Sequence, residues 1–267
     1  MVTNIFDEQN PIEEVAEYFN DLTKRAVQNL NETFAITILP KQKREDEPLP
    51  TEARQFSSYR TRMGTMLEYG LNTEIARLLK DDVDGKILST FVSANQYPDF
   101  YIRRAADLNI LFRIEMKAVD ADSDEQAARF DVPTNEIVPE KDMLLLIGWE
   151  WAPAVNAKDD VIGEYPHIFA SLVLPASHIA AERDARLEIT GGQIIDGKVF
   201  VLSKKEGVMV PDPGNYGKFW RIVHSSRRTS TTTHNNSIQS FVAFLELVSE
   251  HTPRQRMAKI KKKIPTE

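Results

Sequence analysis

Apolar residues follow two different spacings along this chain, and each spacing predicts one kind of secondary structure. In some segments they recur every three to four residues, which is the period of an amphipathic helix. In others they alternate with polar residues or form short continuous runs, which is typical of strands in a buried sheet. The helical period covers residues 11–32, 57–80, 176–188 and 237–249. Strands are predicted at 86–94, in two short pieces within 98–118, and at 143–151, 167–174 and 198–203.

The order of these segments predicts the fold class. Strands that are separated by helices form a sheet with helices packed on it, so we expect an α/β protein with a central mixed β-sheet flanked by helices. Residues 34–39 are apolar enough for one further short strand, and the charged, proline-containing run 41–50 is typical of an exposed loop. No internal repeat or long linker divides residues 1–267, so we predict a single domain.

The polar residues of greatest chemical interest lie within 98–118. The later part of this stretch has an apolar residue at every second position: Ile110, Phe112, Ile114 and Met116. Because successive side chains of a strand point to opposite faces, Arg113, Glu115 and Lys117 share the other face. Asp99 is the nearest acid on the preceding strand. We therefore expect the carboxylates of Asp99 and Glu115 to converge with the ammonium group of Lys117.

Pro98-Asp99, followed by Glu115-Met116-Lys117, resembles the PD-(D/E)xK motif of the restriction-endonuclease-like nucleases, in which the motif also lies on two adjacent strands. The resemblance covers roughly residues 60–120 and depends on a short pattern. It implies a restriction-endonuclease-like fold and, most closely, a type II restriction endonuclease. The alternative, from the residues alone, is an ordinary sheet that carries a solvated acid–base pair.

Many members of this family carry another acid on the helix that precedes the first catalytic strand, and Glu68 is the residue that matches it. Gly64 lies one helical turn earlier and permits a close approach of the backbone to a strand or a substrate. The resemblance therefore implies a catalytic region at about 57–120, with catalytic roles for Glu68, Asp99, Glu115 and Lys117. Alternatively, Glu68 is a solvated residue beside the apolar stripe of its helix.

Composition narrows the remaining possibilities. The 267 residues are 42% hydrophobic and 27% charged, which suits one large α/β domain or two small ones. The chain has no cysteine, which excludes disulfides, thiolate zinc sites and cysteine nucleophiles. No apolar stretch approaches the roughly 20 residues of a membrane span, and the acidic N-terminus does not have the pattern of a signal peptide. We expect a cytoplasmic protein without a membrane partner.

The uneven distribution of charge bears on binding to nucleic acid. The formal net charge of -7 is unfavourable for a DNA-binding protein, because Lys and Arg supply most phosphate contacts. However, residues 213–245 contain no acid, and the tail from 254 to 263 is strongly basic. We therefore place a DNA-recognition region at about 213–264, for which a disordered polar loop is the alternative interpretation. Its predicted DNA-binding residues are Asn215, Lys218, Arg221, His224, Ser225, Arg227, Arg228, Asn235 and Asn236.

Other familiar catalytic motifs are absent from the sequence. It has no phosphate-binding loop, dinucleotide-binding turn, nucleophile elbow or zinc-protease helix, and its five histidines are scattered singly. The carboxylates suit a hard cation, and we expect Mg²⁺ to be held by Asp99 and Glu115, with Glu68 completing a second metal position. Lys117 would orient the attacking water and favour its hydroxide form.

The expected function is the Mg²⁺-dependent, sequence-specific hydrolysis of phosphodiester bonds in double-stranded DNA, and the resemblance implies 5′-phosphate ends. We also expect a homodimer, because two active sites related by a two-fold axis can cut both strands. The resemblance further implies a companion DNA methyltransferase. Two alternatives stay open: a structure-specific repair or recombination nuclease of the same superfamily, and a non-catalytic DNA-binding protein in which Asp99, Glu115 and Lys117 form a surface ion pair.

Overall fold

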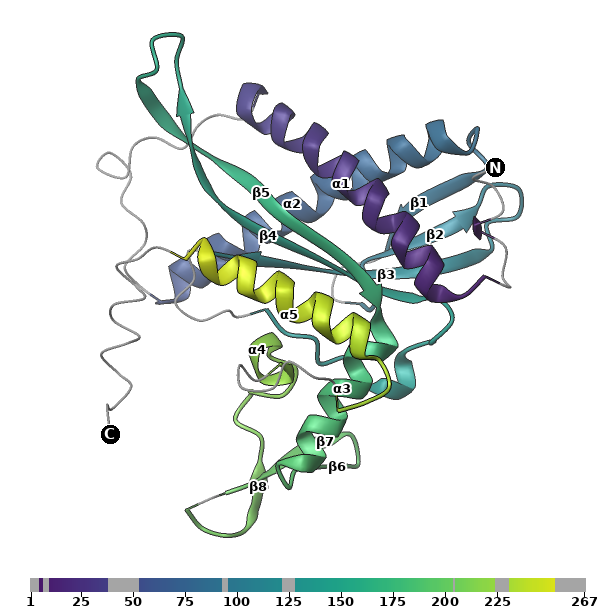
Figure 1. Cartoon of the computed structure of the whole chain (residues 1–267), viewed down its shortest axis with the longest axis vertical. Helices are drawn as coiled ribbons and strands as arrows, with labels where there is room; N and C mark the ends of the chain where they lie inside the picture. Colours follow the sequence, from purple (N-terminus) through teal and green to yellow (C-terminus); the bar gives the residue numbers. More distant parts are fainter. Residues whose placement is uncertain are drawn as a thin grey trace.

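The computed structural model describes residues 5–6, 10–37, 53–92, 96–121, 128–203, 205–223 and 231–252. At its centre lies a mixed five-stranded sheet with the spatial order β1-β2-β3-β4-β5 (Figure 1). The strands are β1 (Ile87–Phe91), β2 (Phe100–Arg104), β3 (Ile110–Asp120), β4 (Asp142–Val155) and β5 (Val161–Pro175). The predicted α/β class with a central mixed sheet is confirmed.

Strand directions make the sheet mixed. β1, β2 and β3 are antiparallel neighbours, β3 runs parallel to β4, and β4 is antiparallel to β5. The connection between the two parallel strands contains, among its described residues, one short 3-10 helix, η2 (Thr134–Glu136). β4 lies in the interior, and side chains on both of its faces are buried from Met143 to Ile147, as its continuous apolar run predicts.

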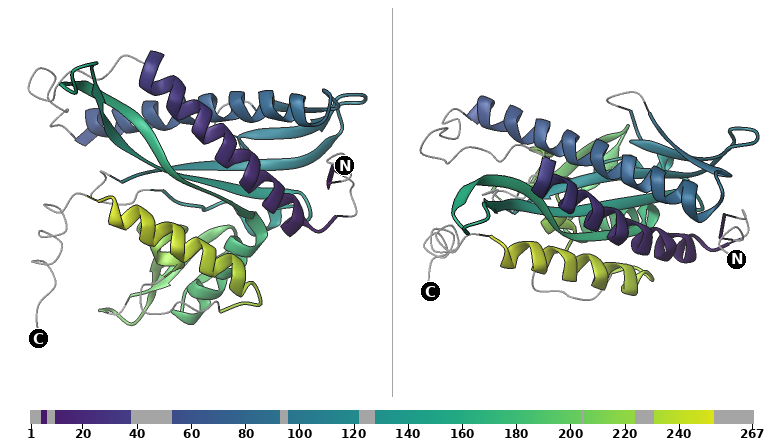
Figure 2. Two further views of the ribbon diagram at one scale, coloured as in Figure 1. Left: turned by 45° about the horizontal axis from the view of Figure 1, so that its top comes forward. Right: turned by 90° about the horizontal axis from the view of Figure 1, so that it is seen from above.

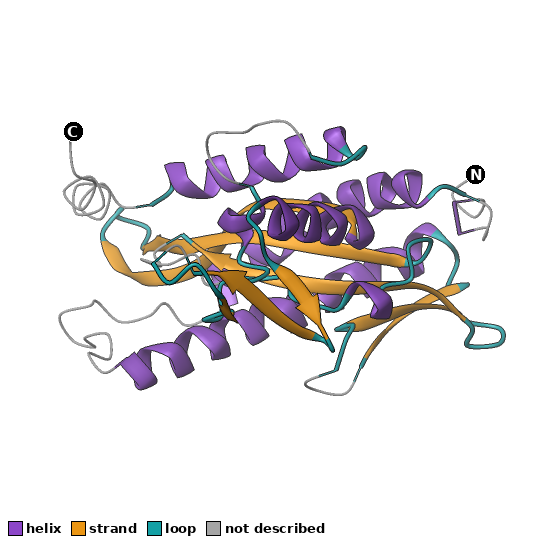
Figure 3. Cartoon of the chain, turned by 90° about the horizontal axis from the view of Figure 1, so that it is seen from below, coloured by secondary structure: helices purple, strands orange, loops and turns teal. Residues whose placement is uncertain are grey.

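Helices cover both faces of the sheet (Figures 2 and 3). α1 (Ile12–Thr37) and α2 (Ala53–Asp82) form one layer, while α3 (Ala176–Ile189), α4 (Phe219–Ile222) and α5 (Asn235–Glu250) lie on the other side. Alternate residues of β4 enter two separate cores: Met143 and Leu145 contact the first layer, and Leu144 and Leu146 the second. No helix within the described residues is long and apolar enough to cross a membrane.

α1 closes the free edge of β5 with two asparagine side chains. The amide of Asn20 donates to the Val173 carbonyl at 2.8 Å and accepts from the Val173 N–H at 2.6 Å. Asn31 makes the same pair of bonds with Ile168, at 2.8 and 2.9 Å. The two asparagines lie three helical turns apart, about 16 Å, which matches the length of strand between Ile168 and Val173. Side-chain amides thus take the place of a neighbouring strand at these two points.

A second, smaller sheet lies outside the central one. It consists of β6 (Gln193–Ile195), β7 (Lys198–Leu202) and β8 (Met209–Pro211), all antiparallel. The predicted strand at 198–203 is β7, and its partners β6 and β8 are too short to give a periodic signal in the sequence. This sheet follows α3 and precedes the predicted DNA-recognition region.

One predicted element is wrong, and its correction has a simple cause. Residues 34–37 continue α1 and do not form a strand, because Phe34 extends the four-residue spacing of Ala26 and Leu30 and is buried with them in the core. Residues 38–39 and the predicted loop 41–50 lie outside the described residues. The helices predicted at 11–32, 57–80, 176–188 and 237–249 are confirmed as α1, α2, α3 and α5.

Candidate active site

The acidic side chains gather where β2 separates from β3. The two strands pair as far as Phe100 and Ile114. Just beyond this pair, the Oδ2 atom of Asp99 accepts a hydrogen bond from the backbone N–H of Met116 at 2.7 Å. On its other side, the backbone carbonyl of Asp99 accepts from the N–H of Val92 at 3.0 Å. Asp99 is therefore held between β1 and β3, with its carboxylate at the edge of β3.

Glu115 and Lys117 project from β3 on the face opposite to the apolar residues Ile114 and Met116, as strand alternation requires. Glu115 is buried, and its Oε1 atom accepts a hydrogen bond from the Nζ atom of Lys117 at 2.5 Å. Because Asp99 caps the N–H of the residue between them, all three side chains predicted from the sequence lie at one place on the strand.

Glu68 reaches the same place from α2. The helix passes close to β3 at Gly64, where an added Cβ would lie 4.0 Å from the Cβ of Ala118. The pKa of Glu68 is raised to about 7, mainly by burial and also by the negative charges of Asp99 and Glu115, while Lys117 opposes the shift. Glu68 is therefore a half-buried member of the acid cluster and not a solvated helix residue.

The cluster carries an excess of negative charge. The pKa of Glu115 is raised, mainly by burial, although the neighbouring Lys117 ammonium opposes the shift. Burial alone lowers the pKa of Lys117, but attraction to the surrounding carboxylates outweighs burial and the pKa is raised. The ammonium group is thus charged at neutral pH, and it faces three carboxyl groups from α2, β3 and the residue before β2.

This donor set fits a hard divalent cation. Carboxylate oxygens are the ligands that Mg²⁺ prefers, and a dication would stabilise the ionised forms of Glu68 and Glu115, whose pKa values are raised by burial and, to a smaller extent, by neighbouring carboxylates. Asp99 and Glu115 each use one oxygen in the bonds described above, which leaves Oδ1 and Oε2 as donors. No group of three or more His, Asp or Glu side chains in the described part of the chain is arranged to hold a metal by itself. A cation here would therefore need water or substrate oxygens as additional ligands.

A second, fully buried acid fixes the segment that carries Asp99. Asp142, at the start of β4, accepts hydrogen bonds from the Tyr97 hydroxyl at 2.6 Å, from the Val138 N–H at 2.9 Å and from the Arg113 guanidinium group. Arg113 also lies over the Tyr97 ring, 5.3 Å from its centre. Tyr97 is two residues before Asp99, so this network links Asp99 to the start of the parallel strand pair. No motif or spacing in the sequence predicts this role of Tyr97 or Asp142.

Part of the predicted DNA-recognition region pairs with the segment that connects β3 to β4. The N–H of Phe130 donates to the Gly217 carbonyl at 2.8 Å, and the N–H of Phe219 donates to the Ala128 carbonyl at 3.3 Å. Gly217 is required here, because its φ is 75° and an added Cβ would lie 2.5 Å from the Phe130 carbonyl oxygen. Asp131, the next residue of the paired segment, contributes to the raised pKa of Glu115.

Arg183 of α3 holds these two segments in place. Its guanidinium group donates to the carbonyls of Phe130 at 3.1 Å and Val132 at 2.7 Å, and it lies 4.5 Å from the centre of the Tyr216 ring. The Tyr216 hydroxyl donates to Asp184 at 2.5 Å. The part of the predicted DNA-recognition region around Tyr216 is therefore held in place by Arg183 and Asp184 and is not a free polar loop.

The predicted DNA-binding residues differ in their surroundings. Asn215 and Lys218 are half-buried, whereas Arg221 is exposed and lies over the Trp220 ring at 4.4 Å from its centre. Asn235 and Asn236 are exposed at the first turn of α5. His224, Ser225, Arg227 and Arg228, together with the basic tail at 254–263, lie outside the described residues.

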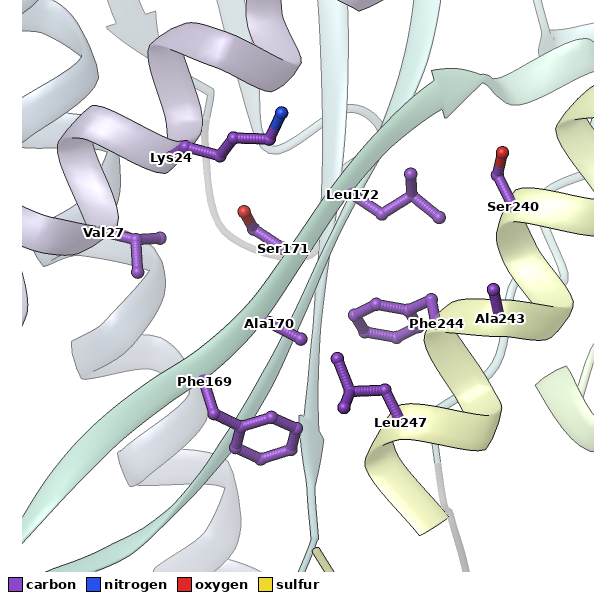
Figure 4. A pocket seen from close by; sticks show the side chains of 10 residues that line it. All are labelled: Lys24, Val27, Phe169, Ala170, Ser171, Leu172, Ser240, Ala243, Phe244 and Leu247. Carbon is purple, nitrogen blue, oxygen red and sulfur yellow. The ribbon is translucent and has the colours of Figure 1, made fainter. Parts of the chain in front are cut away.

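A cavity of about 520 Å³ lies elsewhere, between α1, β5 and α5 (Figure 4). It is lined mainly by apolar side chains such as Val27, Leu172 and Phe244, and it contains none of the residues predicted for catalysis or DNA binding.

No protein-family model matches the chain, and no curated protein matches it. A functional assignment therefore depends on the chemistry of the acid cluster.

Proposed function

We propose that this protein is a Mg²⁺-dependent endodeoxyribonuclease with a restriction-endonuclease-like fold, most like a type II restriction enzyme. One observation carries the proposal: the hydrogen-bonded pair Lys117–Glu115 lies beside Asp99 at a strand edge, in a cluster with more negative than positive charge. An ordinary surface ion pair would be solvated and balanced, but Glu115 is buried and its pKa is raised.

The residues would divide the work of phosphodiester hydrolysis. Asp99 and Glu115 would hold Mg²⁺, and Glu68 would complete a second metal position. When bound, the cation would neutralise charge on the scissile phosphate and polarise its oxygens. The Lys117 ammonium would hold the attacking water and favour its hydroxide form, because positive charge stabilises developing negative charge. Attack of the water oxygen on phosphorus breaks the bond to the 3′ oxygen, which leaves a 3′-hydroxyl and a 5′-phosphate.

Recognition of DNA would come from the anchored segment around Tyr216 and the residues that follow it. Asn215, Lys218 and Arg221 are supported by the pairing of 217–219 with 128–130, and the charge of the following residue, Asp131, contributes to the raised pKa of Glu115. Arg and Asn side chains can read base edges, and Lys holds phosphate. A homodimer would supply one active site for each strand of double-stranded DNA. A function as a restriction enzyme would also imply a companion DNA methyltransferase.

The test is cleavage of supercoiled plasmid by the full chain in the presence of Mg²⁺. Glu115→Gln and Lys117→Ala should abolish cleavage, while Glu14→Gln and Lys158→Ala, which change exposed residues of the same types, should leave it intact. Wild-type rates from both site variants would end the proposal. DNA binding without cleavage over several divalent metals would favour a non-catalytic DNA-binding protein.

A structure-specific repair or recombination nuclease is the second candidate, and one observation favours it: two exposed aromatic rings stack on each other, Tyr69 directly after Glu68 and Phe91 opposite Phe100, the residue after Asp99. A digest of a long, sequenced DNA distinguishes the two forms. Discrete fragments with mapped ends indicate sequence recognition, whereas cuts confined to flaps, junctions or nicks indicate recognition of DNA structure.

A further inference from the structure

Tyr69 of α2 and Phe91 of β1 form a stacked aromatic pair on the protein surface. Their ring centres are 4.2 Å apart, and the ring planes are inclined by 26°. The two residues remain 52% and 43% exposed. Several other aromatic side chains, such as Phe19 and Phe100, are buried in the core. A pair of rings that already stack on each other, and are still open to solvent, is well suited to receive a third flat group.

Both members of the pair are connected directly to the acid cluster. Tyr69 follows Glu68 in α2, and Phe91 pairs across the sheet with Phe100, the residue after Asp99. The N–H of Val92, next to Phe91, donates to the backbone carbonyl of Asp99. The ring pair is therefore joined to the acid cluster through two elements: α2, where Tyr69 is adjacent to Glu68, and the pairing of β1 with β2, whose first residue follows Asp99.

A cation lies on the same side of α2. Arg62 is exposed and precedes Tyr69 by about two helical turns, so both side chains project from one helix face. Within the described residues Arg62 makes no ion pair or hydrogen bond. A positive charge next to an aromatic platform matches a nucleic-acid strand, in which a charged phosphate alternates with a flat base.

We propose that the Tyr69–Phe91 pair stacks against one unpaired nucleobase next to the scissile phosphate, with Arg62 contacting a neighbouring phosphate. This inference rests on the proposed nuclease function and specifies its substrate: DNA with an unpaired nucleotide at the cleavage site. Such a base has two sources, a strand that is already single at a flap or fork, or a base extruded from the duplex by the protein.

The rings can be changed without removing the packing of their elements. The buried stripe of α2 is formed by Leu67, Leu71 and Ile75 on its inner face, and Tyr69 is not part of it. Tyr69→Ala and Phe91→Ala should therefore fold, which thermal unfolding verifies. Tyr69→Trp keeps a stacking surface, and Ile189→Ala removes an equally exposed apolar side chain at the far end of α3 as a control.

The experiment measures binding of the full chain to fluorescein-labelled DNA by anisotropy, without divalent metal so that no cleavage occurs. The probes are a duplex, the same duplex with a single-stranded flap, and the same duplex with one mismatched pair. Tyr69→Ala and Phe91→Ala should each weaken binding to the flap about tenfold, while Tyr69→Trp and Ile189→Ala bind like the wild type.

The three probes separate the two sources of the base. A loss confined to the flap indicates a strand that is already unpaired, whereas a loss on the duplex that is smaller on the mismatched DNA indicates extrusion, because a mismatched base costs less to extrude. Equal affinities for the alanine variants and the wild type on all three probes would overturn the proposal. If the alanine variants bind more weakly than the wild type but the wild type cuts no DNA, the aromatic pair binds a base and the proposed nuclease function is wrong. If the wild type cuts plasmid but the alanine variants bind as tightly as it does, the nuclease function stands and the role of the aromatic pair is wrong.

Discussion

Two ion pairs lie on the same face of β3, a few residues apart, and they differ in how completely their charges are satisfied. Arg113 and Asp142 form the first: the carboxylate is fully buried and accepts from a guanidinium group, a tyrosine hydroxyl and a backbone N–H. Lys117 and Glu115 form the second, where one ammonium group faces three carboxyl groups. The first pair is a closed structural anchor, whereas the second has donor oxygens left for a cation or a substrate. Two oppositely charged pairs that share one face of β3 thus differ in role: the first stabilises the fold, and the second is the proposed site of chemistry.

Removing the ammonium group from the second pair should have the largest effect. We expect Lys117→Met to lower the rate of plasmid cleavage by about 1,000-fold, because the water loses the charge that orients and activates it. The free energy of unfolding should change little. The control is Lys158→Met at an exposed position in the loop between β4 and β5. A variant that cuts within a few-fold of the wild type would place Lys117 outside the reaction.

Breaking the first pair should act on stability instead. Asp142→Ala leaves the Arg113 guanidinium and the Tyr97 hydroxyl without their buried acceptor, and we expect a loss of about 3 kcal/mol in the free energy of unfolding. Denaturation in urea measures this loss. Asp107→Ala, which breaks the exposed pair with Arg104, should have little effect. Equal stabilities of the two variants would contradict the distinction between anchor and site.

A milder change to the anchor should affect the site through Asp99. Tyr97→Phe removes one donor to Asp142, which should cost about 1 kcal/mol of stability. Because Tyr97 precedes Pro98-Asp99, the Mg²⁺ concentration for half-maximal cleavage should rise several-fold, with a smaller change in the rate at saturating Mg²⁺. The control is Tyr165→Phe, whose hydroxyl makes no hydrogen bond within the described residues. An unchanged Mg²⁺ dependence would show that the anchor does not position Asp99.

The smallest expected effect is a change in the pH dependence of stability. The pKa of Glu68 is raised to about 7, so the folded protein holds this proton more tightly than the unfolded chain. This contribution is fully present below the ordinary pKa of 4.5 and is lost as the pH rises to about 7. Glu68→Gln should therefore gain stability relative to the wild type as the pH rises from 4.5 to about 7, and gain nothing near pH 4.5, in metal-free buffer. Parallel profiles of stability against pH would refute the burial of this carboxyl group.

Strand periodicity was sufficient to predict most of the acid cluster. Alternation places Glu115 and Lys117 on one face, and the short separation from Asp99 leaves few alternative partners on the preceding strand. Helical periodicity likewise predicted α1, α2, α3 and α5. These features depend on neighbours within a few residues, where the backbone geometry alone fixes which side chains can meet.

Contacts between distant segments could not be predicted in the same way. The charge of Asp131 acts on Glu115, and Tyr97 meets Asp142, through tertiary pairing that cannot be read from local spacing. The strand predicted at 34–39 shows the opposite error, since its apolar residues fit an extended strand but Phe34 continues the buried stripe of a helix. Local apolar content was ambiguous there, and packing against the core decided the outcome.

The asparagines that α1 places along β5 limit how two copies of the chain can associate. An edge strand with unpaired backbone N–H and C=O groups can pair with a strand of another chain. In β5, however, Asn20 and Asn31 already form hydrogen bonds with the peptide groups of Val173 and Ile168. The proposed homodimer would therefore be held by side chains meeting across a two-fold axis, and a continuous ten-stranded sheet through β5 is sterically blocked by a helix of its own subunit.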